Sequence, residues 1–196
     1  MSGASVYIKI PRDRIGALIG PNGRIKENIE KRLSVDLQID SETGDIVITL
    51  NLTAQDPSLL FRSKEVIAAI GRGFSPESAF RLLMDDEVTL KVIDLREVVG
   101  RSPSDIKRIK GRVIGREGKT RRIIEELTEA NISVYGHTIS IIGNIEQAEA
   151  AREAIQMLMR GSQHSTVYRF LHKKRRELKK KKLELWETRM PSRGQS

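Results

Sequence analysis

The chain of 196 residues contains no cysteine, so disulfide bonds and thiolate metal sites are excluded. Aromatic residues make up only 4% of it, which leaves few side chains for broad stacking surfaces. No apolar run approaches the roughly 20 residues that a membrane-spanning helix needs. Residues 1–4 lack the charged and apolar segments that open a secretory signal. We expect a cytoplasmic protein without a membrane partner.

Signatures of metal binding and of catalysis are also missing. The three histidines, His137, His164 and His172, do not have the spacing of metal ligands, and no serine has the surroundings of a hydrolase nucleophile. The acidic residues 85–87 precede a predicted strand and are interpreted as a solvated turn. We expect no metal, no cofactor and no enzymatic activity.

Positive charge, by contrast, is abundant and unevenly distributed. The formal net charge is +9, and residues 1–159 carry 23 basic and 23 acidic side chains, so the excess lies in residues 160–196. Within the neutral part, residues 107–122 carry eight basic side chains against one acidic, and residues 9–32 carry seven against three. Such clusters favour a polyanionic ligand, although solvated helix faces of a basic protein would look similar.

Both basic segments surround a motif that occurs twice. Residues 18–25 read Leu-Ile-Gly-Pro-Asn-Gly-Arg-Ile and residues 113–120 read Val-Ile-Gly-Arg-Glu-Gly-Lys-Thr, so Gly-x-x-Gly recurs after 95 residues. Glycine has no Cβ, and its backbone can therefore approach a phosphate closely. The helix predicted after each motif points its N-terminal amides at the loop, which favours an anion there. The repetition suggests one function performed twice along one ligand.

The pattern around the first motif predicts the order β-α-α-β-β-α. Alternating and β-branched residues indicate strands, and apolar spacings of three or four indicate helices. The strands are expected at residues 5–10, 35–40 and 46–50, and the helices at residues 12–19, 24–33 and 56–72. The last helix is expected to place Phe61, Val66, Ile67 and Ile70 in a core.

The second half repeats this order, with an inserted loop at residues 95–103. Strands are predicted at residues 88–94, 132–135 and 138–142, and helices at residues 104–113, 119–130 and 145–160. Between the repeats, Ser75 as a helix cap before Pro76 predicts a short bridging helix. In the tail, residues 167–171 are expected to dock as a helix and residues 188–196 to be disordered.

Ile-Gly-x-x-Gly within β-α-α-β-β-α resembles the KH domain of the eukaryotic type (type I). The resemblance covers nearly all of residues 5–160, twice, and implies an α+β fold with two KH-like domains in tandem. It places the first domain at residues 1–73, a bridging helix at residues 74–86, the second domain at residues 87–161 and a basic helical tail at residues 162–196. It also implies a groove for single-stranded RNA beside each loop.

More narrowly, the chain resembles the archaeal relatives of the two-KH pre-ribosomal RNA processing factors. Residues 74–77, 118–120 and 165–169 carry this resemblance. It implies binding of small-subunit ribosomal RNA, or its precursor, near the 3′ end during ribosome biogenesis. It further implies a protein partner, either an rRNA-maturing endonuclease or a translation initiation factor.

The candidate RNA-binding residues lie in the two motifs and in the basic helix before the second one. Arg24 and Lys119 open the helices that follow the loops and are expected to neutralise phosphates. The full set is Ile19, Gly20, Pro21, Asn22, Gly23, Arg24, Ile25, Lys26, Lys107, Arg108, Lys110, Arg112, Ile114, Gly115, Arg116, Glu117, Gly118, Lys119, Thr120, Arg121 and Arg122.

The two motifs differ at their variable positions. Pro21-Asn22 stands against Arg116-Glu117, and Thr120 stands where the first motif has Ile25. We expect unequal grooves, with the second dominating phosphate contact and the first reading more of the bases.

Three other functions compete with RNA binding in ribosome biogenesis. A nucleotide-binding P-loop is excluded because Val113 stands where that motif requires glycine. A general messenger-RNA or translation regulator would use the same grooves. A scaffold that recruits a nuclease or an initiation factor would not need them.

Overall fold

Alternating apolar side chains build a three-stranded antiparallel sheet in each half of the chain. The computed structural model describes residues 4–52, 54 and 56–189. The first sheet has the order β1 (Ser5–Lys9), β3 (Asp45–Leu50), β2 (Val35–Ile39), and the second has the order β4 (Thr89–Asp94), β6 (Thr138–Gly143), β5 (Asn131–Tyr135). The middle strand of each sheet is thus the last of its three along the chain.

Helices cover one face of each sheet. In the first unit these are α1 (Ile15–Ile19), α2 (Arg24–Leu33) and α3 (Ser58–Gly71), with short 3₁₀ turns at Arg12–Arg14 and Pro21–Gly23. In the second unit they are α6 (Pro103–Ile114), α7 (Lys119–Thr128) and α8 (Ile145–Met159), with a 3₁₀ turn at Arg116–Gly118. The α+β fold and the repeated order β-α-α-β-β-α are confirmed.

The two units are connected by α4 (Pro76–Ala79) and a 3₁₀ turn, η3 (Phe80–Leu83). Ser75 caps α4, because its hydroxyl accepts a hydrogen bond from the Ser78 amide at 3.3 Å. Ala79 and Leu82 are buried, so the bridge is packed between the units as its apolar side predicts.

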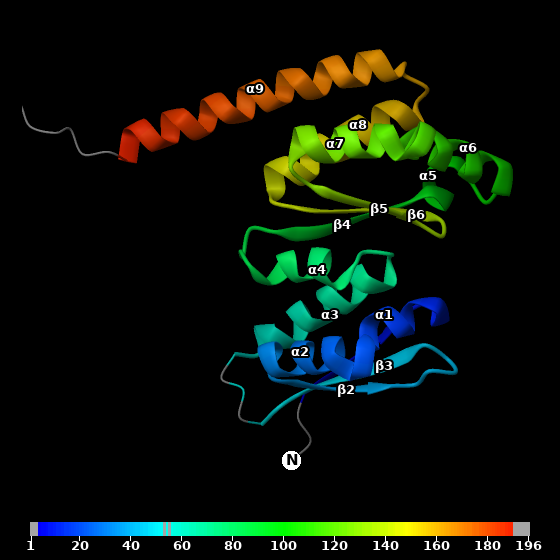
Figure 1. Cartoon of the computed structure of the whole chain (residues 1–196), viewed down its shortest axis with the longest axis vertical. Coiled ribbons are helices and arrows are strands. Elements are labelled where there is room, and N and C mark those ends of the chain that lie inside the picture. Colours follow the sequence, from blue (N-terminus) through cyan, green and yellow to red (C-terminus); the bar gives the residue numbers. More distant parts are fainter. Residues whose placement is uncertain (1–3, 53, 55, 190–196) are drawn as a thin grey trace, which may run out of the picture.

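The first unit stacks its helices on the open face of the second sheet, which gives alternating layers of sheet and helices (Figure 1). Val88, Leu90 and Ile142 of the second unit pack into the core of the first. Polar contacts surround this interface: the Ser133 hydroxyl donates to the Arg72 carbonyl at 2.8 Å. The guanidinium of Arg81 donates to the Glu129 carbonyl and to the Asn131 side chain.

Tyr135 links the second sheet to the start of the first helical layer. Its hydroxyl donates to the Asp13 carboxylate at 2.5 Å, and the Arg14 guanidinium lies 5.9 Å from its ring centroid. Burial, and then the neighbouring Asp13 carboxylate, raise the pKa of Tyr135. The phenol therefore remains a hydrogen-bond donor at neutral pH.

Only one of the two sheets is covered on both faces, because their open faces differ in polarity. The outward face of the first sheet presents polar side chains and an exposed Tyr7, with Lys9 paired to Asp45 at 3.2 Å. The equivalent face of the second sheet carries Leu90 and Ile142, which need burial. The first sheet accordingly forms the lower end of the molecule in Figure 1.

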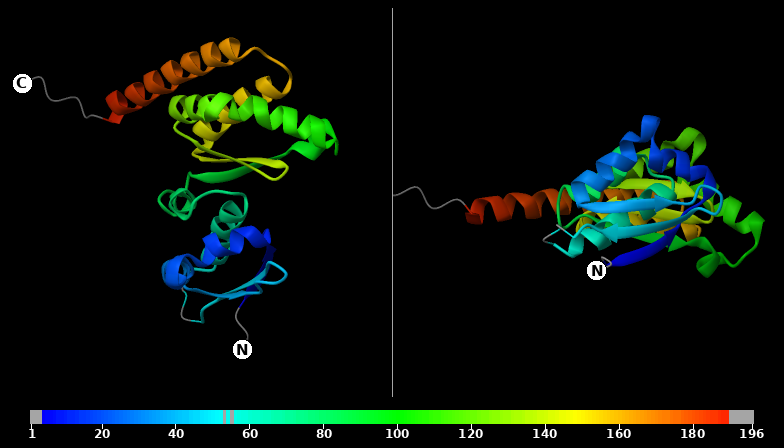
Figure 2. Two further views of the ribbon diagram at one scale, coloured as in Figure 1. Left: turned by 45° about the vertical axis from the view of Figure 1, so that its right-hand side comes forward. Right: turned by 90° about the horizontal axis from the view of Figure 1, so that it is seen from below.

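The tail is a single long helix, α9 (His164–Arg189). Its first half lies over α7 and α8 and buries Val167 and Leu171, which confirms the predicted docking. Its second half projects past the body of the molecule (Figures 1 and 2). The expected disorder at residues 188–196 falls on the last two residues of α9 and on residues 190–196, which lie outside the described part of the chain.

Two local expectations are wrong. Residues 95–103 are not only a loop, since α5 (Leu95–Val99) forms there, and the Asp94 side chain caps it by accepting from the Arg96 amide at 2.9 Å. Phe61 does not join the core, because it lies on the solvent face of α3 and is 64% exposed. No helix in the described residues is long and apolar enough to cross a membrane.

Candidate nucleic-acid interface

The two glycine loops have nearly the same backbone conformation. Gly20 and Gly115 have φ/ψ of 72°/176° and 71°/177°, and Gly23 and Gly118 have 76°/3° and 76°/10°. Both loops end where the next helix begins, so the N-terminal amides of α2 and α7 face them. The repeated sequence motif therefore forms a repeated backbone conformation.

The two glycines of each loop have different physical roles. A Cβ at Gly20 would lie 2.3 Å from the Ile25 side chain, and one at Gly115 would lie 2.2 Å from the Thr120 hydroxyl. The first glycine is thus required for packing the loop against its own helix. At Gly23, no described atom lies within 4 Å of an added Cβ, and at Gly118 the nearest is 3.8 Å away on Arg122. The second glycine leaves open space that a ligand backbone can enter.

Between these glycines, a residue with a side chain adopts a left-handed conformation. Asn22 has φ of 51° and Glu117 has φ of 52°. Asparagine tolerates this region, whereas glutamate does so at a cost of about 1 kcal/mol. The Arg122 side chain donates to the Glu117 carbonyl and holds the second loop in this shape.

The loops differ in the number of backbone donors that they offer. Pro21 has no N–H, while Arg116 at the same place has one. Arg116 also adds a cationic side chain, which is exposed. The second loop can therefore make more hydrogen bonds to an anion than the first.

Several predicted binding residues are already engaged within the protein. Arg112 donates to the Leu158 carbonyl at 3.0 Å and to the Ser162 carbonyl at 2.6 Å, so it caps the end of α8. Lys110 donates to the Gly136 carbonyl at 2.9 Å, across to the turn between β5 and β6. Lys107 and Arg108 of the same helix are exposed. The accessible part of the basic helix is thus smaller than its sequence suggests.

Each groove also has an edge strand beside the second helix. In these strands the amides of Leu37 and Ile132 donate to the carboxylates of Glu30 and Glu125 at 2.9 and 2.8 Å. These glutamates occupy equivalent positions and pair with Lys26 and Arg121 one turn earlier. A ligand that uses those strand amides must displace a glutamate.

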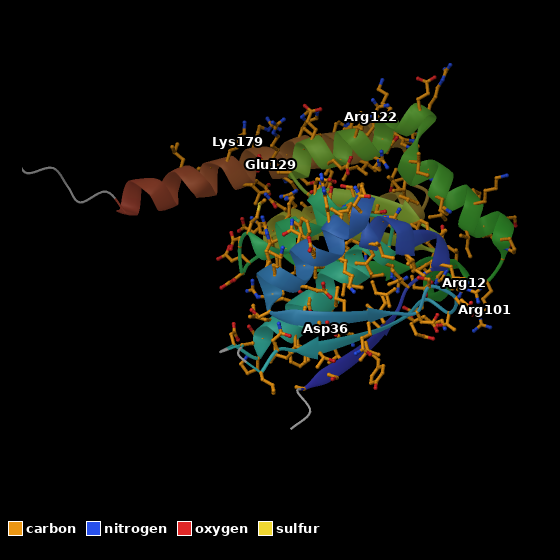
Figure 3. The ribbon with its side chains drawn as sticks, turned by 60° about the horizontal axis from the view of Figure 1, so that its bottom comes forward. Arg12, Asp36, Arg101, Arg122, Glu129 and Lys179 are labelled. Atoms are coloured by element: carbon orange, nitrogen blue, oxygen red, sulfur yellow. The ribbon has the colours of Figure 1, made fainter. Side chains whose placement is uncertain are left out.

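Cationic side chains surround the second loop on the outer surface. Arg122 projects into solvent from the start of α7 (Figure 3). Lys119 and Arg116 are exposed beside it. The described residues contain no group of three or more His, Asp or Glu side chains placed to hold a metal ion. The site is suited to electrostatic binding of phosphates.

Sequence reasoning missed two residues of this site, His164 and Tyr168. The first turns of α9 place both against the second loop, where the Tyr168 hydroxyl lies 3.1 Å from the Thr120 hydroxyl. His164 and Tyr168 are four residues apart in the sequence, but no local sequence pattern predicts that they lie near Thr120.

Comparisons with known proteins match both units. Residues 89–176 fit the family model described as eukaryotic type KH-domain (KH-domain type I), and residues 5–53 fit the KH domain model. A KH domain-containing protein of Methanocaldococcus jannaschii is 46% identical over 91% of this chain and 78% of its own length. The pre-rRNA-processing protein PNO1 of Candida albicans is 25% identical over 82% of this chain and 58% of its own length.

Two crystal structures from Pyrococcus horikoshii are also similar. One is Dim2p, at 47% identity, with 87% of this chain and 99% of the other covered and a TM-score of 0.81. The other is a complex of a/eIF2alpha, aDim2p and rRNA, whose matching chain is 46% identical with 89% and 95% covered and a TM-score of 0.83.

Proposed function

Because this chain belongs to the family of two-KH-domain proteins that includes Dim2p and PNO1, we propose that it binds single-stranded RNA without catalysing a reaction on it. Its ligand is the region near the 3′ end of small-subunit ribosomal RNA or its precursor. The observation that carries this proposal is the pair of loops with nearly the same backbone conformation, each with an open second glycine.

The binding mechanism follows from the loop geometry. The sugar-phosphate backbone passes over Gly23 and Gly118, where no Cβ obstructs it. Amides at the start of α2 and α7 and the side chains of Arg24 and Lys119 bind its phosphate oxygens. The second loop dominates this contact because Arg116 supplies an N–H and a charge that Pro21 does not.

The division of the chain follows the same proposal. Residues 1–73 and 87–161 are the two RNA-binding domains, residues 74–86 connect them rigidly, and residues 162–196 add positive charge. The ribosomal target is supported by the relative PNO1, a pre-rRNA-processing protein. A translation initiation factor as protein partner is supported by the similar complex of a/eIF2alpha, aDim2p and rRNA. Ribosome assembly would place the protein in the cytoplasm.

Fluorescence anisotropy with labelled RNA tests this function. We expect the full chain to bind a single-stranded oligonucleotide from the 3′ end of its own small-subunit rRNA more tightly than a scrambled oligonucleotide or a duplex of equal length. If about four phosphates are neutralised, log K should fall against log salt with a slope of about −2.8. Equal affinity for the scrambled RNA would favour a general regulator, and no RNA binding with retained protein partners would favour a scaffold.

A gain of function should be possible at the first loop. In the background Gly118→Asp, where the first loop binds alone, Pro21→Arg should raise RNA affinity by more than about fivefold, since one added backbone hydrogen bond contributes about 1 kcal/mol and the guanidinium charge adds to it. Pro21→Ala is the matched control that restores the N–H without the charge, and it should give a smaller gain. If neither variant binds RNA more tightly, the missing donor does not explain the difference between the loops.

A further inference from the structure

We propose that the start of α9 completes the second RNA groove and forms a subsite for one further nucleotide, whose base stacks on Tyr168 beside His164 and whose phosphate is bound by Arg108 and Arg116. This inference rests on the proposed function and extends it to a surface between the second glycine loop and α9. The subsite is a cleft of about 510 Å³ between α9, α6 and the second loop.

The side chains of Tyr168 and His164 form one wall of the cleft, and hydrogen bonds hold both in place. The Tyr168 hydroxyl is hydrogen-bonded with the Thr120 hydroxyl at 3.1 Å, and Nε2 of His164 lies 3.0 Å from the Arg112 carbonyl, so this nitrogen carries the proton and donates it. The ring centroids are 6.3 Å apart and tilted by 57°. Val167 and Leu171 are buried on the same stretch of helix and keep both rings beside the loop.

Gly111 in the floor of the cleft leaves room for a ligand. Gly111 lies on the exposed side of α6 and lines the cleft together with Gly115. At Gly111, an added Cβ would meet none of the described atoms within 4 Å. A flat base can therefore approach the helix backbone closely at this point.

The rim of the cleft is cationic. Arg108, Arg116 and Lys119 all line it and are exposed. Arg108 is paired with Asp105 at 3.1 Å, but such an exposed pair is weak and leaves other guanidinium donors for a phosphate. Glu117 is also exposed in the loop and opposes an anion, so the rim carries three cations against two carboxylates, Asp105 and Glu117.

The first unit does not carry these residues at the matching positions. Asp13, Ala17 and Pro21 stand where the second unit has Arg108, Arg112 and Arg116. Asp13 is moreover committed to Tyr135, and Ile25 in place of Thr120 offers no hydroxyl to an aromatic residue. The subsite therefore belongs to the second groove, and it gives that groove a preference for a longer segment of RNA.

The chemistry of the cleft favours a nucleotide of single-stranded RNA. Aromatic rings stack on any unpaired base and tolerate sequence changes, whereas a duplex keeps its bases stacked on each other. Removing one such stacking side chain lowers affinity by about tenfold. The cations at the rim bind the phosphate of the same nucleotide, since phosphate binding needs charge and donors within reach.

An abasic scan of the RNA tests the subsite in the full-length protein. Each nucleotide of the 3′-end oligonucleotide is replaced in turn by an abasic one, and the dissociation constants are measured for wild type and Tyr168→Leu. At one position adjacent to the loop-bound segment, the abasic change should weaken binding to wild type about tenfold and leave binding to Tyr168→Leu unchanged. Tyr168→Phe, which keeps the ring, should retain most of the affinity, and Tyr7→Leu is the matched control on the exposed first sheet.

A second measurement needs no variant, in case Tyr168→Leu does not fold. 2-Aminopurine placed at that position should lose fluorescence when the wild type binds, because the base becomes stacked. If Tyr168→Leu binds the intact RNA as tightly as wild type, or 2-aminopurine is not quenched at any position, the proposed subsite is wrong. The proposed function still stands in that case, provided that Gly118→Asp weakens binding by at least tenfold. If wild type binds none of these RNAs, the proposed function itself fails.

Discussion

Gly118→Asp is expected to weaken binding of the 3′-end RNA by at least tenfold. The carboxylate would occupy the open space beside the second glycine and meet the approaching phosphate, and losing one charge-assisted hydrogen bond while adding a like charge costs at least about 1.4 kcal/mol. Gly23→Asp should weaken binding less, because the first loop offers fewer donors. Anisotropy titrations of both variants and of the double variant measure these losses.

Gly100→Asp is the matched control for this prediction. Gly100 also has φ of +76°, lies in the same unit, and has no described atom within 4 Å of an added Cβ. Both substitutions carry the same charge change, but Gly100→Asp carries the larger backbone strain, because its ψ of −173° lies in a region that essentially only glycine adopts, whereas Gly118 has ψ of 10°. Gly100→Asp should leave RNA affinity within about twofold of wild type, given its place outside the motif. Unchanged affinity in the double variant Gly23→Asp/Gly118→Asp would rule out the loops as the binding site.

Gly73→Ala is expected to lower the free energy of unfolding by about 3 kcal/mol. The residue has φ of +93°, and an added Cβ would lie 2.7 Å from the Ser133 Oγ and 2.8 Å from the Tyr135 Cβ. The substitution therefore combines backbone strain with overpacking at the interface between the units, each costing about 1–2 kcal/mol. Denaturant unfolding followed by circular dichroism measures the change.

Gly161 provides the matched control, since it follows α8 as Gly73 follows α3. It has the same φ of +93°, and among the described atoms nothing lies within 4 Å of an added Cβ. Gly161→Ala should lose only the backbone contribution, about 1–2 kcal/mol. Equal losses of unfolding free energy in the two variants would show that the interface accommodates the added methyl group at no cost. The stacking of the first unit on the second sheet would then contribute little to stability.

The order of elements in both units was predictable because it rests on local patterns. Alternation in Val35–Ile39 and apolar spacing in Arg24–Leu33 depend on neighbours along the chain, and both elements formed within a residue of their expected bounds. The loop shape was predictable for the same reason, since glycine at fixed positions permits the left-handed backbone that the structure contains. The KH resemblance was confirmed over both repeats.

The wrong predictions concern residues whose sequence pattern does not specify which side of the element is buried. Phe61 is apolar, but a helix has several apolar residues and only the face toward the sheet is buried, so the burial of one residue depends on the packing of the whole helix. Arg112 stays a predicted RNA-binding residue, but no local pattern indicates that its guanidinium also reaches the carbonyl groups at the end of α8, more than 40 residues further along the chain.

The sequence by itself determined two repeated loops with open glycines, unequal in charge and in backbone donors, because these properties belong to the residues themselves. The tertiary structure decided two further features. It stacked the first unit on the second sheet, since Leu90 and Ile142 share an apolar face only once the strands pair. It also brought Tyr168 to Thr120, across 48 residues, since the docking of α9 depends on where α7 and α8 leave an apolar surface. Contacts between distant segments follow from packing, and no local pattern in this chain encodes them.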